Sequence, residues 1–149
     1  KVYFPYRKDK KKRFLSTCNE NDIGNINQIN LFDKKLVITK SYKDCRVLRN
    51  QGINSIWLQN EGCFPDKEII FPLINHYEDI IVFYDNDNTG IKASKKVADI
   101  IYSELNKGRV IHLPIDFLQD GISDISDLIV KDKKKVVEFL RNNEVYEPT

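Results

Sequence analysis

The spacing of apolar residues predicts alternating strands and helices from residue 34 onward. Short apolar runs rich in Val and Ile predict buried strands, and the stretches between them carry apolar residues at helical spacing. The predicted strands cover residues 34–40, 55–59, 79–85 and 108–114. The predicted helices cover residues 42–52, 65–77, 89–108 and 133–143. Four such alternations predict an α/β domain with a four-stranded, mainly parallel sheet flanked by helices.

The first 32 residues follow a different pattern. Residues 2–7 and 12–17 predict two short strands joined by a lysine-rich turn, and residues 18–30, rich in Asn, predict a loop. We therefore expect a short N-terminal β-hairpin extension over residues 1–32 and a core domain over residues 33–149.

Basic residues and aromatic residues are interleaved in this extension. Residues 1–13 contain seven Lys or Arg and one Asp. Such a mixture is typical of surfaces that hold phosphates and stack bases, although a charged hairpin turn that only keeps the protein soluble has the same composition. The candidates for phosphate binding are Arg7, Lys10, Lys11, Lys12 and Arg13.

Composition narrows the class of protein. The chain has 149 residues, 41% of them hydrophobic, and a net charge of +2, which fits one domain. Its three cysteines show no CxxC spacing, which argues against a disulfide scaffold or a zinc site and favours a reducing compartment such as the cytoplasm. No apolar run approaches the ~18 residues of a membrane span, so we expect no membrane partner. Because methionine is absent even at position 1, we expect a piece of a longer protein.

Acidic residues follow the predicted strands. The carboxyl ends of parallel strands meet in one crevice, so these side chains are expected to converge there. Hard cations such as Mg²⁺ or Mn²⁺ prefer carboxylate oxygens. Asp85 and Asp87 stand two residues apart and are therefore expected to point the same way and share an ion. The other candidates at strand ends are Asp44, Glu61, Asp124 and Asp127.

The segment from Asp85 to Gly90 has two other interpretations. An EF-hand loop needs Glu at its twelfth position, which is Lys96 here, so a calcium loop is excluded. A plain strand-to-helix turn, with Asp capping the helix and Gly easing the turn, stays open. His76 and His112 are isolated, and no nucleophile triad is evident.

Three segments in order resemble the motifs of Toprim domains. Residues 36–53 resemble the first motif, residues 80–101 resemble the DxD motif, and residues 121–129 resemble the downstream acidic segment. The resemblance covers residues 34–140 and implies a Toprim-like Rossmannoid fold. It is greatest to phage-type DNA primases. Lys40 stands where the family has its catalytic Glu, so the resemblance leaves two hypotheses: Glu61 supplies the missing carboxylate, and Lys40 contacts a phosphate. A solvated loop acid and a surface lysine are the alternatives.

The resemblance implies metal-dependent primer synthesis on a DNA template from nucleoside triphosphates. It assigns catalysis to Glu61, Asp85 and Asp87, with Mg²⁺ or Mn²⁺ held by Asp85 and Asp87. Asp44, Asp124 and Asp127 would form an outer shell or hold a second ion. Lys40, Lys43 and the basic extension would hold phosphates, and other replication domains or a helicase would be partners. A Toprim nuclease and a non-catalytic DNA- or partner-binding module remain alternatives. A topoisomerase fits less well, because Thr89 replaces the third acid of its motif.

Overall fold

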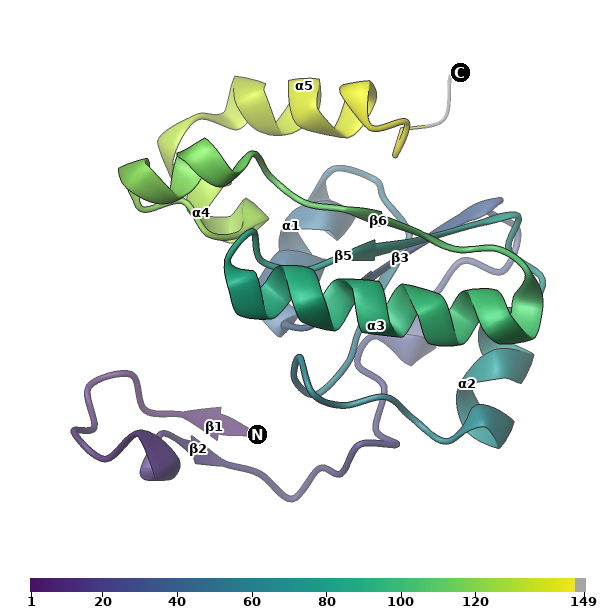
Figure 1. The fold of residues 1–149 in the computed structure, drawn as a ribbon, viewed down its shortest axis with the longest axis horizontal. Coiled ribbons are helices and arrows are strands. Elements are labelled where there is room, and N and C mark those ends of the chain that lie inside the picture. The colour runs from purple at the N-terminus through teal and green to yellow at the C-terminus, as the bar shows by residue number, and fades with distance from the viewer. Residues whose placement is uncertain (147–149) are drawn as a thin grey trace.

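The computed structural model describes residues 1–146 and contains a four-stranded sheet, all of it parallel, between two layers of helices (Figure 1). The strand order is β4-β3-β5-β6. The strand β4, which follows β3 in the sequence, therefore lies at one edge of the sheet, and β6 lies at the other. The strands are β3 (Lys35–Thr39), β4 (Ser55–Trp57), β5 (Asp79–Phe83) and β6 (Arg109–Ile111). The predicted α/β class and parallel sheet are confirmed.

Helices connect the strands and complete the domain. The helices are α1 (Tyr42–Asn50), α2 (Lys67–Ile74), α3 (Asn88–Leu105), α4 (Ile125–Lys131) and α5 (Lys133–Asn142). Short 3₁₀ turns are η1 (Lys10–Lys12), η2 (Ile26–Gln28) and η3 (Ile115–Asp120). Ser or Asp side chains accept a backbone N–H at the start of α1, α3, α4 and α5. These caps satisfy N–H groups that the helix itself leaves free.

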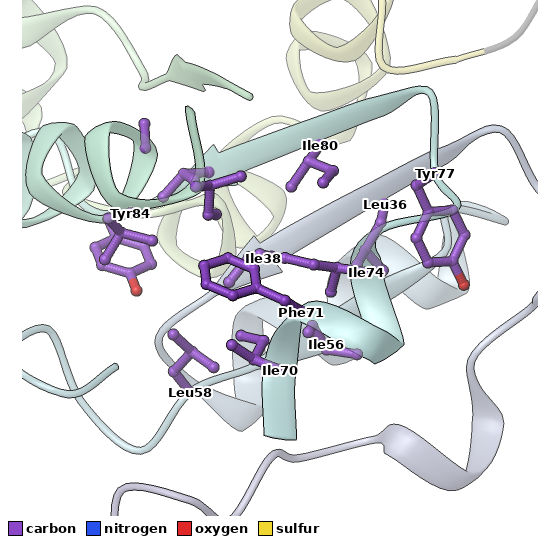
Figure 2. Packing of buried hydrophobic residues seen from close by; sticks show 14 residues of the cluster. Leu36, Ile38, Ile56, Leu58, Ile70, Phe71, Ile74, Tyr77, Ile80 and Tyr84 are labelled. Carbon is purple, nitrogen blue, oxygen red and sulfur yellow. The ribbon is translucent and has the colours of Figure 1, made fainter. Parts of the chain in front are cut away.

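One face of the sheet packs against α2 and α3 (Figure 2). Leu36 and Ile38 of β3 point to this face, while Val37 between them points to the other, as the two-residue period of a strand requires. Ile70 and Ile74 of α2 cover the β3 side chains and are fully buried. This packing explains why the predicted strand runs are almost continuously apolar.

The opposite face packs against α1, α4 and α5. Val37 and Ile81 lie under Leu48 of α1, and Leu128 and Leu140 extend the cluster through α4 and α5. The apolar residues of α4 therefore hold the N-terminus of this helix, where Asp124 stands, against the sheet.

All four predicted strands end earlier than expected at their carboxyl ends, and the difference is largest for β6. The last strand ends at Ile111, which pairs with Phe83, the final residue of β5. Since β6 lies at an edge and has β5 as its one neighbour, its ladder stops where β5 stops. Leu113 remains buried beyond the ladder.

The N-terminal extension forms an antiparallel hairpin separate from the four-stranded sheet (Figure 1). Its strands are β1 (Val2–Tyr3) and β2 (Phe14–Leu15), and the rings of Tyr3 and Phe14 stack with centroids 4.6 Å apart. The Lys1 side chain donates a hydrogen bond to the backbone oxygen of Gln59, which follows β4. The hairpin is therefore tied to a loop at the carboxyl end of the sheet. Among the described residues, no helix is both long and apolar enough to cross a membrane.

Candidate metal centre

Three buried carboxylates converge at the carboxyl ends of the parallel strands. Asp44, Asp85 and Asp124 each place an oxygen within 4.8 Å of the others, and we call these residues the acidic trio. They come from the first turn of α1, the end of β5 and the start of α4, three segments that the sheet topology brings together. The expected convergence of acids at strand ends is thus present in the structure.

Asp85 lies two residues beyond β5 and is 8% exposed. Its Oδ2 lies 2.9 Å from the Lys40 ammonium, but its Oδ1 accepts no hydrogen bond from any described residue. Burial raises the pKa of Asp85 to about 6; Lys40 opposes this rise, and the charges of Asp124 and Asp44 add to it. A buried carboxylate oxygen without a donor is costly, so this atom is the clearest candidate ligand for a cation.

Asp44 joins α1 to α4 through two serine hydroxyls. Ser41 donates to its Oδ2 and Ser126 donates to its Oδ1, both at 2.6 Å. Ser41 also caps α1 by accepting the backbone N–H of Asp44. Burial raises the pKa of Asp44, the nearby charge of Asp124 adds to the rise, and the two hydroxyls partly offset it. The geometry fixes the carboxylate, and no cation in the described part of the chain forms an ion pair with it.

Asp124 caps α4 and faces Lys43 across the site. Its Oδ1 accepts the backbone N–H of Asp127, and its Oδ2 accepts a hydrogen bond from Lys43 at 2.8 Å. Burial alone would lower the pKa of Lys43. The hydrogen bond to Asp124 and the charges of Asp124 and Asp44 outweigh burial and raise this pKa above its ordinary value. Most of the Lys43 side chain is exposed, so it can turn toward a phosphate at the rim of the trio.

Lys40 lies between two carboxylates from neighbouring strand ends. Its ammonium is 2.9 Å from Asp85 and 3.4 Å from Glu61. Burial works against its charge, yet the hydrogen bond to Asp85 and the charges of Asp85 and Glu61 raise the pKa of Lys40 above its ordinary value. Lys40 therefore stays protonated at neutral pH and acts as a fixed cation, which makes it unsuitable as a general base.

Asp87 and Asp127 accept hydrogen bonds at the starts of α3 and α4. Asp87 caps α3 by accepting the Gly90 N–H at 2.7 Å, as the strand-to-helix turn interpretation expects. Asp127 accepts the N–H and O–H of Ser123. Burial alone would raise the pKa of Asp127, but these donors lower it. Neither residue belongs to the acidic trio, so the sharing of an ion by Asp85 and Asp87 stays a prediction.

The five basic candidates of the hairpin are solvent-exposed, except for Arg13, which is partly buried. The Arg7 guanidinium lies 3.9 Å from the Phe4 ring centroid and donates to the backbone oxygen of Lys12. Arg13 donates to the backbone oxygen of Arg7, and the stretch Lys10–Lys12 forms η1. The hairpin thus presents several cations on one small, internally bonded unit.

The trio has the composition of a site for one hard divalent cation. Its donors are oxygen atoms from three carboxylates, which Mg²⁺ and Mn²⁺ prefer. The unpartnered Oδ1 of Asp85 and the buried carboxylate of Asp44, which forms no ion pair with a described residue, fit such an ion. Sequence reasoning missed Ser126, which orients Asp44. Its place between Asp124 and Asp127 was the available signal, but only the packing of α4 against α1 brings its hydroxyl to Asp44.

The sequence was compared with protein-family models and with curated proteins, and neither comparison gives a match.

Proposed function

We propose that this chain is a Toprim-like module that performs metal-dependent nucleotidyl transfer in DNA primer synthesis. The observation that carries the proposal is the acidic trio, with its buried, unpartnered Asp85 Oδ1, at the carboxyl ends of a parallel sheet. The three sequence segments that resemble Toprim motifs supply Asp44, Asp85 and Asp124 in that order. The phage-type primase resemblance selects the reaction.

Asp44, Asp85 and Asp124 would hold Mg²⁺ or Mn²⁺. The ion would neutralise triphosphate oxygens while the 3′-hydroxyl of the growing strand attacks the α-phosphorus and pyrophosphate leaves. Asp44 is pre-positioned for this role by Ser41 and Ser126. The carboxylate of Asp85 would exchange part of its contact with Lys40 for the ion.

Lys40, Lys43 and Glu61 would act around the ion. Lys40 is a permanent cation beside Asp85 and would bind a phosphate oxygen of the nucleotide. Lys43, which is more exposed, would hold a phosphate at the rim. Glu61, held by Lys40 at 3.4 Å, is the candidate that takes the proton of the 3′-hydroxyl. The basic hairpin, tied to the loop before Glu61 through Lys1, would hold the template strand.

A non-catalytic binding module is the second candidate, and the placement of Lys40 favours it. The Lys40 ammonium already neutralises part of the Asp85 charge that the family uses for metal. A nuclease would use the same trio to activate water in place of the 3′-hydroxyl.

Product analysis separates these activities. We expect the protein, given a single-stranded DNA template, nucleoside triphosphates and Mg²⁺ or Mn²⁺, to make short new strands, and Asp85→Ala to abolish them. Asp116→Ala, which removes an exposed acid of η3, is the matched control and should retain activity. Shortening of a labelled strand without nucleotides would identify a nuclease. Metal binding without either product would favour the binding module.

A further inference from the structure

A pocket of about 280 Å³ lies against α1, on a different side from the acidic trio. Tyr42, Arg46 and Arg49 contribute to its lining and are four and three residues apart, so they share one side of the helix. Asp44 is two residues from both Tyr42 and Arg46, which places it on the opposite side. The two sites are therefore separated by about 10 Å, the diameter of a helix.

Aromatic rings form part of the pocket wall. Trp57 ends the edge strand β4, and its ring meets that of Tyr42 edge-on, with centroids 6.3 Å apart and planes at 73°. Tyr42 is 61% exposed, so its ring is available to a ligand. Gly24 exchanges two backbone hydrogen bonds with Trp57 and lies directly against the indole, where an added Cβ would be 1.9 Å from the ring. The loop that carries Gly24 therefore packs against one side of the indole.

The pocket is positively charged. Arg46 is exposed and forms no ion pair with any residue in the described part of the chain. Arg49 donates to the backbone oxygen of Gln28 at 2.7 Å, which keeps its guanidinium beside the loop. The pocket lining includes no acidic residue, whereas it includes the exposed amide of Asn27. An anion is therefore favoured, and an amide is available for a polar ring edge.

We propose that this pocket binds one nucleotide, with the base against Tyr42 and Trp57 and the phosphate on Arg46 and Arg49. Aromatic rings beside guanidinium groups are the combination that holds unpaired nucleotides, through stacking and phosphate contacts. The volume suits a single base with its sugar, since it lies just below the roughly 300 Å³ at which pockets for drug-sized ligands begin.

The nucleotide could belong to a single strand or be free in solution, and the proposed function favours a strand that passes from this pocket to the acidic trio. The choice of a strand rests on that function. Binding itself does not need the metal centre. Tests in EDTA therefore separate failure of this inference from failure of the proposed catalysis.

Trp57 is the chain's single tryptophan, so its fluorescence reports on this pocket directly. We expect an oligodeoxythymidine of roughly ten nucleotides to quench Trp57 in EDTA, and dTMP or dTTP to do so much more weakly. Equal quenching by the free nucleotides would support the pocket and identify a free nucleotide as its ligand. No quenching by strand or nucleotides would overturn the proposal.

Matched variants locate the binding. Arg46→Ala and Tyr42→Ala should each raise the Kd of the labelled oligonucleotide, measured by anisotropy, about tenfold, which corresponds to loss of one stacking or phosphate contact. Tyr42→Phe, which keeps the ring, should bind as the wild type does. Arg141→Ala removes an equal charge from the exposed surface of α5 and should change the Kd less than twofold. Equal weakening by Arg46→Ala and Arg141→Ala would show diffuse charge attraction and contradict the pocket. Normal strand binding by Asp85→Asn would support two separate sites, while its loss would contradict them.

Discussion

The two sides of α1 present opposite environments. On one side Asp44 is buried with two other carboxylates and is held by hydroxyls from two segments. On the other side Tyr42 and Arg46 are exposed, and Arg46 has no carboxylate partner in the described chain. One nine-residue helix thus carries an acidic site that packing fixes and a basic, aromatic site that a ligand can reach.

The difference shows how burial changes the meaning of a charge. Carboxylates that are removed from water repel one another and take up protons more readily, as the pKa of Asp85 near 6 illustrates. A cation that enters this site relieves a cost already present in the fold. The arginines on the other side remain solvated, so their charges cost the fold little free energy. A phosphate that binds there would gain a contact but would not relieve an unfavourable interaction within the protein.

The largest effect is expected from Gly90→Ala, which disturbs the acidic side. A Cβ at Gly90 would lie 2.4 Å from the backbone oxygen of Asp85 and 2.9 Å from its Cβ. The helix start and Asp85 must then move apart, so we expect a loss of roughly 3 kcal/mol in unfolding free energy and loss of metal binding. Urea unfolding and a Mn²⁺ titration measure both. Gly62→Ala is the matched control, because its new Cβ would come no closer than 3.4 Å to a neighbour. Equal stability of the two variants would contradict the close approach.

The second effect is a pH dependence that Asp85 causes when metal is absent. The folded state holds the proton of Asp85 up to about pH 6, whereas the unfolded chain releases it near 3.8. The protonated Asp85 therefore stabilises the folded state fully below pH 3.8. This contribution to the unfolding free energy is lost as the pH rises to 6, and the loss amounts to roughly 3 kcal/mol at most. Lys40, Asp44 and Asp124 are the charges that face it. Unfolding in EDTA from pH 4 to pH 7.5 should show a steeper loss for wild type than for Asp85→Asn. Parallel curves would contradict this.

Lys40→Ala should have a smaller effect, which lowers the stability of the metal-free protein and raises its affinity for metal. Removing the ammonium leaves Asp85 and Glu61 without their shared partner, so we expect the metal-free protein to lose about 2 kcal/mol. Metal should bind about tenfold more tightly, since a repelling cation has been removed. Calorimetric titration with Mn²⁺ gives the affinity. Lys96→Ala, on the exposed side of α3, should change neither quantity. Weaker metal binding by Lys40→Ala would show that Lys40 supports the ion.

The smallest effect on stability is expected from Gly24→Ala, on the aromatic side. The new Cβ would push the Trp57 indole away, but the indole borders solvent and can turn, so we expect a loss of about 1 kcal/mol. Oligonucleotide binding should weaken severalfold while Mn²⁺ affinity stays unchanged. A variant that loses metal binding but keeps oligonucleotide binding would reverse the assignment of the two sides.

More of the fold than of the candidate site could be predicted from the sequence. Continuous apolar runs such as residues 79–85 identify buried parallel strands, and the rule for strand ends places Asp44, Asp85 and Asp124 together. What the spacing could not show is which of Asp85 and Asp87 joins the trio. Both leave the same strand, but the start of α3 draws Asp87 into a cap.

The aromatic-basic pocket was missed for a related reason. Tyr42, Arg46 and Arg49 have a spacing that predicts one shared side of a helix. Their partner Trp57 lies on the edge strand β4, and Gly24 pairs with it through an isolated bridge. Local spacing carries no information about such a contact between segments more than 30 residues apart.

Metal binding by the acidic trio tests the central claim most directly. Mn²⁺ at millimolar concentration should raise the Tm of the wild-type protein, because an ion that binds the folded state alone stabilises it. Asp85→Asn and Asp44→Asn should abolish that rise, while the exposed control Asp116→Asn should keep it. A Tm that does not respond to Mn²⁺ in the wild type, or an equal rise in all four proteins, would contradict a metal centre at Asp44, Asp85 and Asp124.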